Sequence, residues 1–263
     1  MPPLLNIAVR AARRAGDTIL RYLGRLESYE IATKSRNEFV TEVDRLAEQE
    51  IVQTIRQNYP DHGVLAEESG RHGRPDSEFL WIIDPLDGTT NFIHGFPVFS
   101  VSVALQHRGR LEQGVIYDPL RQELFTASRG EGAQLDGRRI RVSRTQTLDH
   151  ALVGTGFPYR SKAEWVDRYL DMLRVLMDRS AGVRRPGSAA LDLAYVAAGR
   201  FDGFWEFGLQ PWDMAAGVLL IREAGGLVGG LTGEDDFHED GNIVAGNPKI
   251  FAALLEAIRP FVR

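Results

Sequence analysis

The chain has 263 residues, of which 43% are hydrophobic and 25% are charged, the proportions of an ordinary globular protein. The formal net charge is −5, so the composition provides no general basic surface for nucleic acid. There are no cysteines, which excludes disulfides, thiolate nucleophiles and cysteine metal sites. No apolar run reaches membrane-spanning length, and the early arginines Arg10, Arg13 and Arg14 argue against a signal peptide. We therefore expect a cytoplasmic protein.

The first part of the chain predicts two amphipathic helices followed by strands. Apolar residues recur at helical spacing through residues 5–23 and again after Thr41. A continuous apolar run at residues 79–83 is typical of a strand that is covered on both faces. Shorter apolar or alternating runs predict further strands, at residues 64–66, 99–105, 111–116 and 123–127, the later ones forming an antiparallel meander.

The second part alternates strands with helices. Strands are expected at residues 151–153, 182–185, 204–207 and 243–245. Helices are expected at residues 166–176 and 188–198, from Pro211 to the Gly225-Gly226 pair, and from Pro248 onward. This order predicts layered α and β elements in an α/β (α+β) fold. We predict one domain over residues 1–263, with an antiparallel-rich half at 1–150 and an α/β half at 151–263.

The strongest chemical signal is the string Asp84-Pro85-Leu86-Asp87-Gly88-Thr89, which follows the apolar run. The predicted strand ends in Asp84 and a tight turn then presents Asp87, so two carboxylates leave one strand end close together. Such a pair repels unless one member is protonated, and a hard divalent cation such as Mg²⁺ resolves the conflict. Gly88 and Thr89 are expected to begin a short helix whose N–H groups suit a phosphate. For the Asp-Gly dipeptide alone, a structural turn is the alternative.

The same string excludes one class of phosphatase. Haloacid-dehalogenase-like phosphatases use the pattern Asp-x-Asp-Gly-Thr, in which the first Asp is a phosphorylated nucleophile. Here the position two residues before Asp87 is Pro85. The earlier carboxylate, Asp84, therefore stands one residue too early for that geometry.

The string resembles the signature of the inositol monophosphatase family. Three further segments match that family in order, namely Ala66-Glu67-Glu68-Ser69, Gly187-Ser188-Ala189-Ala190 and Pro211-Trp212-Asp213-Met214. Residues 89–95 and 191–200 are similar to the bacterial SuhB branch of the family. The resemblance covers nearly the whole chain. It implies a layered αβαβα sandwich of the inositol monophosphatase and fructose-1,6-bisphosphatase type.

The resemblance implies a Mg²⁺ site built from four acids and one carbonyl. Glu67, Asp84 and the backbone carbonyl of Leu86 would hold a first metal. Asp84, Asp87 and Asp213 would hold a second, and Glu67 would share a weaker third. In this scheme the metals activate a water and stabilise the leaving alkoxide, without a phosphoenzyme.

The resemblance also implies roles around the substrate. Asp44 and Thr89 would orient and deprotonate the attacking water, with Glu67 contributing. The N–H groups of Gly88 and Thr89 would bind phosphate. The polyol contacts implied by the family are Gly187, Ser188, Ala189, Glu206 and Asp213.

Each of these assignments has a local structural alternative. Asp213 follows a Pro at an expected helix start, where an acid favours the first turn. Asp44 completes the pattern Thr41-Glu42-Val43-Asp44, which fits a capping box. Ser188 fits a helix N-cap, and Glu206 fits a surface position at a strand end.

Arg184 and Arg185 are interpreted as solvated, and Gly154-Thr155-Gly156 lacks the third glycine of a dinucleotide fingerprint.

The function implied by the resemblance is hydrolysis of inositol 1-phosphate. Fructose-1,6-bisphosphate, histidinol phosphate and a nucleotide 3′-phosphate are alternative substrates for the same chemistry. A second role is binding of NusA and RNA polymerase in ribosomal RNA antitermination, which the SuhB branch implies. A homodimer and sensitivity to lithium are further expectations from the family.

Overall fold

A computed structural model gives the fold. It describes residues 2–23, 31–35, 38–74, 76–158, 165–235 and 240–262, with the backbone alone for 31–35 and 38–41. Within these ranges, no helix combines the length and the apolar content needed to cross a bilayer.

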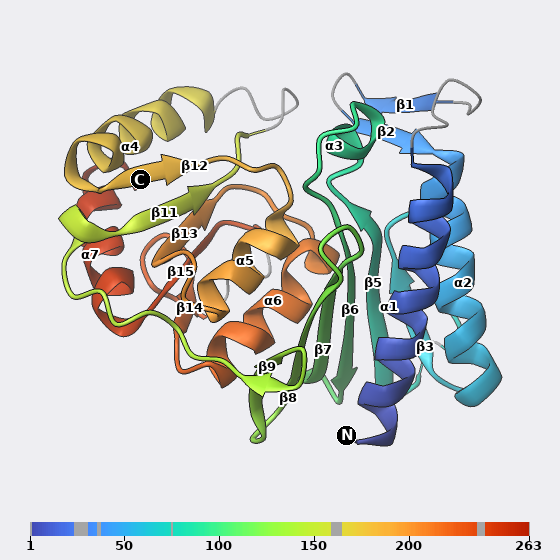
Figure 1. Ribbon diagram of the computed structural model, residues 1–263. Coiled ribbons are helices and arrows are strands. Elements are labelled where there is room, and N and C mark those ends of the chain that lie inside the picture. The colour runs from blue at the N-terminus through green and yellow to red at the C-terminus, as the bar shows by residue number, and fades with distance from the viewer. Residues whose placement is uncertain are drawn as a thin grey trace.

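Helices and two large sheets alternate in five layers (Figure 1). The helices α1 and α2 cover one face of the first sheet, and α5 and α6 lie between the two sheets. The helices α4 and α7 cover the outer face of the second sheet. The order α, β, α, β, α confirms the predicted sandwich. The helices are α1 (Pro3–Tyr22), α2 (Glu42–Asn58), α3 (Thr89–Ile93), α4 (Val166–Arg179), α5 (Ala189–Ala197), α6 (Pro211–Glu223) and α7 (Pro248–Ile258), with 3-10 turns at Leu148–His150 and Arg259–Phe261.

The first sheet has eight strands in the order β10-β9-β8-β7-β6-β5-β3-β4. All neighbours are antiparallel except β3 and β5, which run parallel. This one parallel pair brings the carboxyl ends of two strands to the same edge. The strands are β3 (Gly63–Ala66), β4 (Gly70–His72), β5 (Phe79–Asp87), β6 (Ser100–His107), β7 (Arg110–Asp118), β8 (Glu123–Ser128), β9 (Gly132–Leu135) and β10 (Arg138–Arg139).

The second sheet has five strands in the order β12-β11-β13-β15-β14. Its central pair, β11 and β13, is parallel, while β15 is antiparallel to β13 and β14. The strands are β11 (Leu152–Thr155), β12 (Gly182–Arg184), β13 (Gly203–Glu206), β14 (Leu227–Gly229) and β15 (Ile243–Gly246). A separate hairpin pairs β1 (Ile31–Ser35) with β2 (Glu38–Thr41).

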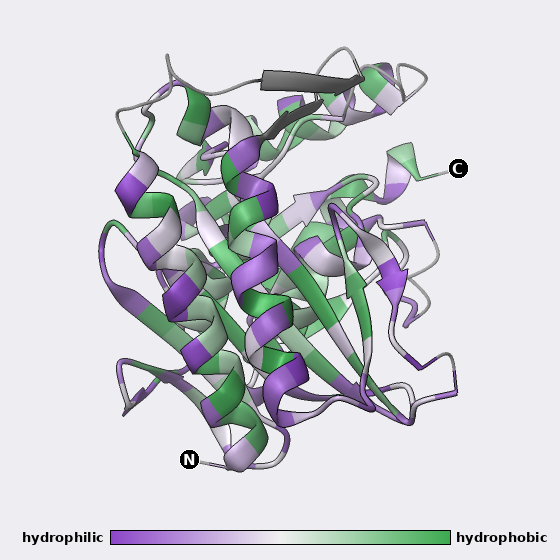
Figure 2. Ribbon diagram, turned by 90° about the vertical axis from the view of Figure 1, so that its right-hand side faces the viewer, coloured by the Kyte–Doolittle hydropathy of each residue, from purple (hydrophilic) through white to green (hydrophobic). Residues whose placement is uncertain are grey.

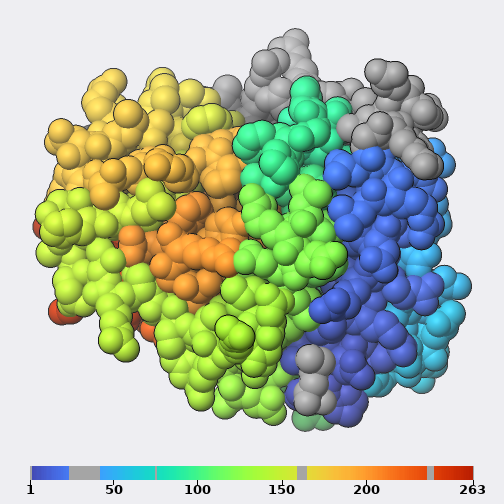
Figure 3. All heavy atoms as spheres, in the orientation of Figure 1, coloured from blue at the N-terminus to red at the C-terminus, as the bar shows by residue number. Residues whose placement is uncertain are grey.

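Three clusters of buried apolar side chains fill the spaces between the layers. One lies between α1, α2 and the first sheet, the second surrounds α5 and α6 between the sheets, and the third lies under α4 and α7. Figure 2 shows that the outer faces of α1 and α2 are polar. Their sequences are amphipathic because the opposite faces pack against the first sheet. In Figure 3 the blue N-terminal helices and the yellow and orange second half lie on opposite sides of the same face.

The structure differs from the sequence prediction at the end of β5. The strand does not stop at Asp84 but continues to Asp87, and its pairing with β6 shifts between these two residues. Pro85 cannot donate a ladder hydrogen bond, so an irregularity here replaces the expected turn. The sequence analysis also missed β1, β2, β4, β9, β10 and β14, which are two to five residues long. Such short strands carry too few residues for a clear alternation.

Close packing of α5 against α6 generates a stability prediction at Gly217. A Cβ added there would lie 2.5 Å from the Cβ of Leu193. Alanine at a helix-interior glycine normally stabilises by up to about 1 kcal/mol, but overpacking here should make Gly217→Ala destabilising by about 1–3 kcal/mol. Urea unfolding measures the change.

The control is Met177→Ala on α4, where the side chain is exposed. Its effect should stay within about 0.5 kcal/mol. A Gly217→Ala protein that is as stable as the wild type would contradict the packing argument.

Candidate functional site

The site lies where strand ends of both sheets face the amino ends of two helices. The parallel strands β3 and β5 end at one side, and the parallel strands β11 and β13 end at the other. The helices α5 and α6 begin between them. Loops after the carboxyl ends of parallel strands are the usual place for a ligand in layered α/β folds.

Glu67 is placed by the pairing of β3 with β5. Ala66 lies opposite Ile83 in the parallel register, so Glu67 follows its strand at the level of Asp84. The Glu67 N–H donates to the Ile83 carbonyl at 3.1 Å. Glu67 and Ile83 are 16 positions apart in the sequence, and the parallel pairing of β3 with β5 brings them into contact.

Asp84 and Leu86 form a local turn inside the irregular end of β5. The Asp84 side chain is 1% exposed, and its Oδ1 accepts the Leu86 N–H at 3.0 Å. The Leu86 carbonyl in turn accepts the Thr89 hydroxyl at 3.0 Å. Gly88 follows with a φ of 96°, and a Cβ there would lie 2.9 Å from the Val98 carbonyl oxygen. Glycine in the Asp-Gly-Thr string is therefore required by the backbone.

Asp87 reaches across to the start of α5. Its Oδ2 accepts the Ser188 hydroxyl at 2.5 Å and the Ala190 N–H at 2.8 Å. Ser188 does occupy the N-cap position, but its side chain makes no capping bond within α5. The carboxylate of Asp87 serves that helix end instead, which the positive end of the helix dipole favours.

Asp44 contacts the same string from α2. Its side chain is 1% exposed, and its Oδ1 lies 3.0 Å from the Thr89 hydroxyl. Thr89 thus lies within hydrogen-bond distance of both Asp44 and the Leu86 carbonyl. The two positions predicted to act on the water are adjacent, although 45 residues separate them. The Thr41 side chain, needed for the capping alternative, lies outside the described side chains.

Asp213 combines a capping bond with a place in the cavity. Its Oδ2 accepts the Gln210 N–H at 2.7 Å, and the two residues form a capping box at the start of α6. The local alternative from the sequence is therefore confirmed. Asp213 also lines the cavity that contains the other three acids.

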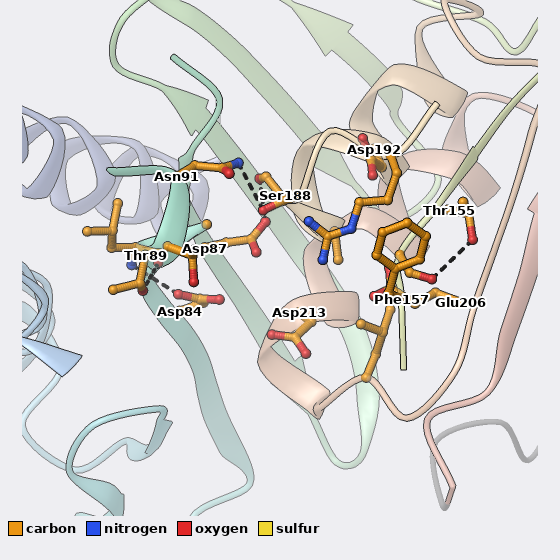
Figure 4. A pocket seen from close by; sticks show the side chains of 18 of the residues that line it. Asp84, Asp87, Thr89, Asn91, Thr155, Phe157, Ser188, Asp192, Glu206 and Asp213 are labelled. Carbon is orange, nitrogen blue, oxygen red and sulfur yellow. Dashed lines mark hydrogen bonds between the residues drawn. The ribbon is translucent and has the colours of Figure 1, made fainter. Parts of the chain in front are cut away.

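One cavity of about 330 Å³ brings nearly all the predicted site residues together. Figure 4 shows Asp84, Asp87 and Thr89 on one side, Glu206 and Thr155 on the other, and Asp213 between them. Asp44 touches the cavity through Thr89 and is not itself part of the wall. The predicted residues in the wall are Glu67, Asp84, Leu86, Asp87, Gly88, Thr89, Gly187, Ser188, Ala189, Glu206 and Asp213.

The electrostatics of the cavity reflect several like charges withdrawn from water. Burial, followed by repulsion from Glu67, Asp87 and Asp213, holds the pKa of Asp84 well above its ordinary value. Burial and the charge of Asp87 do the same to the pKa of Asp213. Burial raises the pKa of Asp87 to about 6, although the Ser188 and Ala190 donors oppose the rise.

Glu206 is a strongly perturbed carboxyl on the opposite side of the cavity. Its side chain is buried, not at the surface as the local alternative had it. Burial raises the pKa of Glu206 to about 8; Arg185 opposes the rise and Asp87 adds to it. Strongly shifted groups gathered in one hollow make it the candidate functional site.

The donor set fits a hard divalent cation. Four carboxylates and the Leu86 carbonyl offer oxygen ligands of the kind that Mg²⁺ selects. Burial, and after it the repulsion between the acids, raises the pKa values of Asp84 and Asp213, and a cation would offset both causes. Among the described residues, no three acidic or histidine side chains are already arranged around one point. The acids share one hollow, and their side chains would have to rotate to bring them onto one ion.

Several residues of the cavity wall were not predicted from the sequence. Arg185 was interpreted as solvated, and Thr155 and Gly156 were rejected as a nucleotide motif, yet all three line the cavity. The Arg185 guanidinium lies 4.8 Å from the centre of the Phe157 ring. Gly156 leaves room for the Glu206 carboxylate, since a Cβ there would lie 1.8 Å from one of its oxygens.

Asp192 is a further missed residue, and the sequence contained a signal for it. It is the one charged residue in α5, Ala189–Ala197, among eight uncharged neighbours. The side chain is 1% exposed and lines the cavity. Burial, with the charges of Glu206 and Asp87, holds its pKa well above the ordinary value. A lone acid in an apolar helix is the pattern that could have revealed it.

Known proteins resemble the chain over almost its full length. The model of the "Inositol monophosphatase family" matches residues 1–262. The chain belongs to this family. Its curated relatives include "Nus factor SuhB" of Pseudomonas aeruginosa, 57% identical over 99% of this chain and 97% of the relative. "Nus factor SuhB" of Escherichia coli is 52% identical over 98% of this chain and 97% of that protein.

Solved structures of family members have the same fold. The SuhB protein of Bartonella henselae superposes with a TM-score of 0.96 at 44% identity, covering 99% of this chain and 100% of that one. An inositol monophosphatase from Thermotoga maritima gives a TM-score of 0.89 at 35% identity, covering 99% and 98%. Both the phosphatases and the SuhB branch therefore share this architecture, as the sequence resemblance predicted.

The raised pKa of Glu206 predicts how stability depends on pH in the EDTA-treated protein. Between about pH 4.5 and 8 the folded state keeps a proton that the unfolded state loses, so stability falls as pH rises. Glu206→Gln removes this loss. Its Tm should exceed that of the wild type by about 5 °C or more at pH 8, with a much smaller difference at pH 5.

Calorimetry at both pH values measures the effect. The control is Glu256→Gln, at a position where the side chain is exposed. The control should follow the wild type at both pH values. An equal Tm difference for Glu206→Gln at pH 5 and pH 8 would show that Glu206 is not protonated in the folded state.

Proposed function

We propose that this protein is a Mg²⁺-dependent phosphomonoesterase that hydrolyses inositol 1-phosphate. The proposal rests on one observation, the convergence of Glu67, Asp84, Asp87 and Asp213 on a single cavity from three segments of the chain. Membership of the inositol monophosphatase family supports it. Bound Mg²⁺ would supply Lewis-acid activation of water and neutralisation of the phosphate charge.

The chain's own groups have distinct tasks in this proposal. Glu67, Asp84, Asp87, Asp213 and the Leu86 carbonyl hold the cation. The Thr89 hydroxyl lies 3.0 Å from Asp44 Oδ1. Thr89 orients the attacking water and passes a proton of that water toward the Asp44 carboxylate. The contact between the Thr89 hydroxyl and Asp44 Oδ1 supports this role, because it is short enough for a proton to pass between them.

The substrate contacts two sides of the cavity, one through its phosphate and the other through its polyol. The N–H groups of Gly88 and Thr89 receive the phosphate. Gly187, Ser188, Ala189 and Glu206 form the side of the cavity that meets the polyol. A Glu206 carboxyl that keeps its proton near neutral pH can both donate to and accept from a hydroxyl group. This suits a neutral polyol better than a second anionic group, and so favours inositol 1-phosphate over fructose-1,6-bisphosphate.

Removal of one metal ligand tests the proposal. Asp84→Asn should lower kcat for inositol 1-phosphate by at least about 100-fold, because a neutral amide binds the cation more weakly than a carboxylate does. The fold should persist, since the carboxyl and the amide have the same shape. Phosphate release over a panel of about a dozen phosphomonoesters, with Mg²⁺, with EDTA and with added Li⁺, measures the effect; histidinol phosphate and a nucleotide 3′-phosphate belong in the panel.

The matched control is Asp178→Asn on the exposed side of α4, which should keep wild-type turnover. Circular dichroism checks the fold of both variants. Near-normal turnover of Asp84→Asn, or activity that is indifferent to EDTA, would refute the metal-dependent mechanism.

A second role is favoured by the names of the relatives. Proteins with 49–57% identity to this chain are called Nus factors or putative Nus factors. We propose that this chain also binds NusA and RNA polymerase, as a cytoplasmic homodimer.

A pull-down with purified NusA separates the two roles. Wild-type protein and Asp84→Asn should retain NusA equally, because a surface contact does not need the metal ligands. Size-exclusion chromatography with light scattering tests the homodimer in the same preparations. Failure of both proteins to retain NusA would reject the transcription role and leave the phosphatase proposal standing.

A further inference from the structure

The buried face of α2 carries two acids one helical turn apart. Asp44 and Glu48 are 1% and 5% exposed, and residues four apart lie on the same face of a helix. Asp44 contacts Thr89 after β5. Glu48 contacts a different segment, the turn between β3 and β4 that carries Glu67.

Glu48 binds the backbone of that turn with both carboxylate oxygens. Its Oε2 accepts the Glu68 N–H at 2.8 Å, and its Oε1 accepts the Ser69 N–H at 3.1 Å. These bonds join residues 20 and 21 positions apart. Bonds from N–H groups to an ionised carboxylate are stronger than neutral ones.

The Glu67 turn is therefore held at three successive backbone positions. The Glu67 N–H is bound by the Ile83 carbonyl, and the next two N–H groups are bound by Glu48. Glu67 has β5 on one side and α2 on the other. With both contacts in place, the backbone of Glu67 has little freedom to turn its side chain away from Asp84.

A second contact on the outside of the turn is weaker. The Ser69 hydroxyl lies 3.0 Å from His72 Nε2, and His72 Nδ1 lies 2.6 Å from an Arg56 nitrogen. Both pairs are exposed, and exposed polar pairs contribute little. The buried carboxylate of Glu48 is thus the main restraint on the turn from the α2 side.

We propose that Glu48 is a positioning residue for the cation site, acting through the backbone of residues 67–69. The inference rests on the proposed function, because it assigns Glu67 to the cation. Neither the sequence patterns nor the family roles assigned above include Glu48. Glu48 and Asp44 lie on the same face of α2. This helix therefore connects the turn that carries Glu67, through Glu48, with the Thr89 hydroxyl, through Asp44.

The test measures Mg²⁺ binding directly. Isothermal titration of full-length protein with MgCl₂ should show affinity lowered about 10-fold in Glu48→Ala, the effect typical of lost outer contacts in metal sites. Glu48→Gln keeps one acceptor oxygen and should lose about 3-fold. Hydrogen exchange of the amides of residues 67–69 should accelerate in the same order. In kinetics, the Mg²⁺ concentration for half-maximal activity should rise more than kcat falls.

The matched control is Glu50→Gln, two residues along α2, where the side chain bonds Arg14 away from the cavity. It should keep wild-type Mg²⁺ affinity and exchange rates. Lower thermal stability of the Glu48 variants with unchanged Mg²⁺ affinity would overturn the proposal and leave Glu48 a structural residue. If Glu48→Ala does not fold, unchanged affinity in Glu48→Gln with faster exchange at residues 67–69 overturns it.

The experiment separates this inference from the proposed function. Wild-type protein that binds Mg²⁺ no better than Asp84→Asn would refute both. Wild-type protein that binds Mg²⁺ normally, with Glu48 variants that do the same, refutes only the role of Glu48.

Discussion

The structure depends on the concentration of negative charge in one partly enclosed hollow. Asp84 and Asp213 have strongly raised pKa values because burial and mutual repulsion act together. A protein tolerates such a group of acids when neighbouring dipoles, donors or a cation offset the charge. The rest of the fold can be read as the means of bringing these acids together and of supplying those compensating groups.

The compensation comes from backbone groups at the ends of strands and helices. Asp87 accepts the Ala190 N–H at the start of α5, and Asp213 caps α6 through the Gln210 N–H. Both acids thus use helix amino ends that point into the hollow. Structural and metal-binding interpretations of these residues are compatible, because a carboxylate has two oxygens and each interpretation uses one of them.

Much of the fold was predictable from local patterns, whereas most of the site residues were predicted from the resemblance to the inositol monophosphatase family. The helices α1 and α2 followed from periodicity, the strand β5 from its continuous apolar run and the start of α7 from Pro248. The Asp84 to Thr89 string marked Asp84 and Asp87. Arg185 and Glu48 were not predictable, because a basic pair and a helical Glu are most often solvated. Asp192 could have been found, since it interrupts an apolar helix.

The sequence by itself determined the residue types and the family, because the string Asp84 to Thr89 and the segments around Glu67 and Asp213 are matched in order along the chain. Only the tertiary structure decided which groups meet. Asp87 bonds Ser188 across 101 positions, and Asp44 meets Thr89 across 45. Sequence patterns describe neighbours within a helix or a strand. Contacts between elements depend on strand pairing and layer packing, which the one-dimensional pattern does not contain.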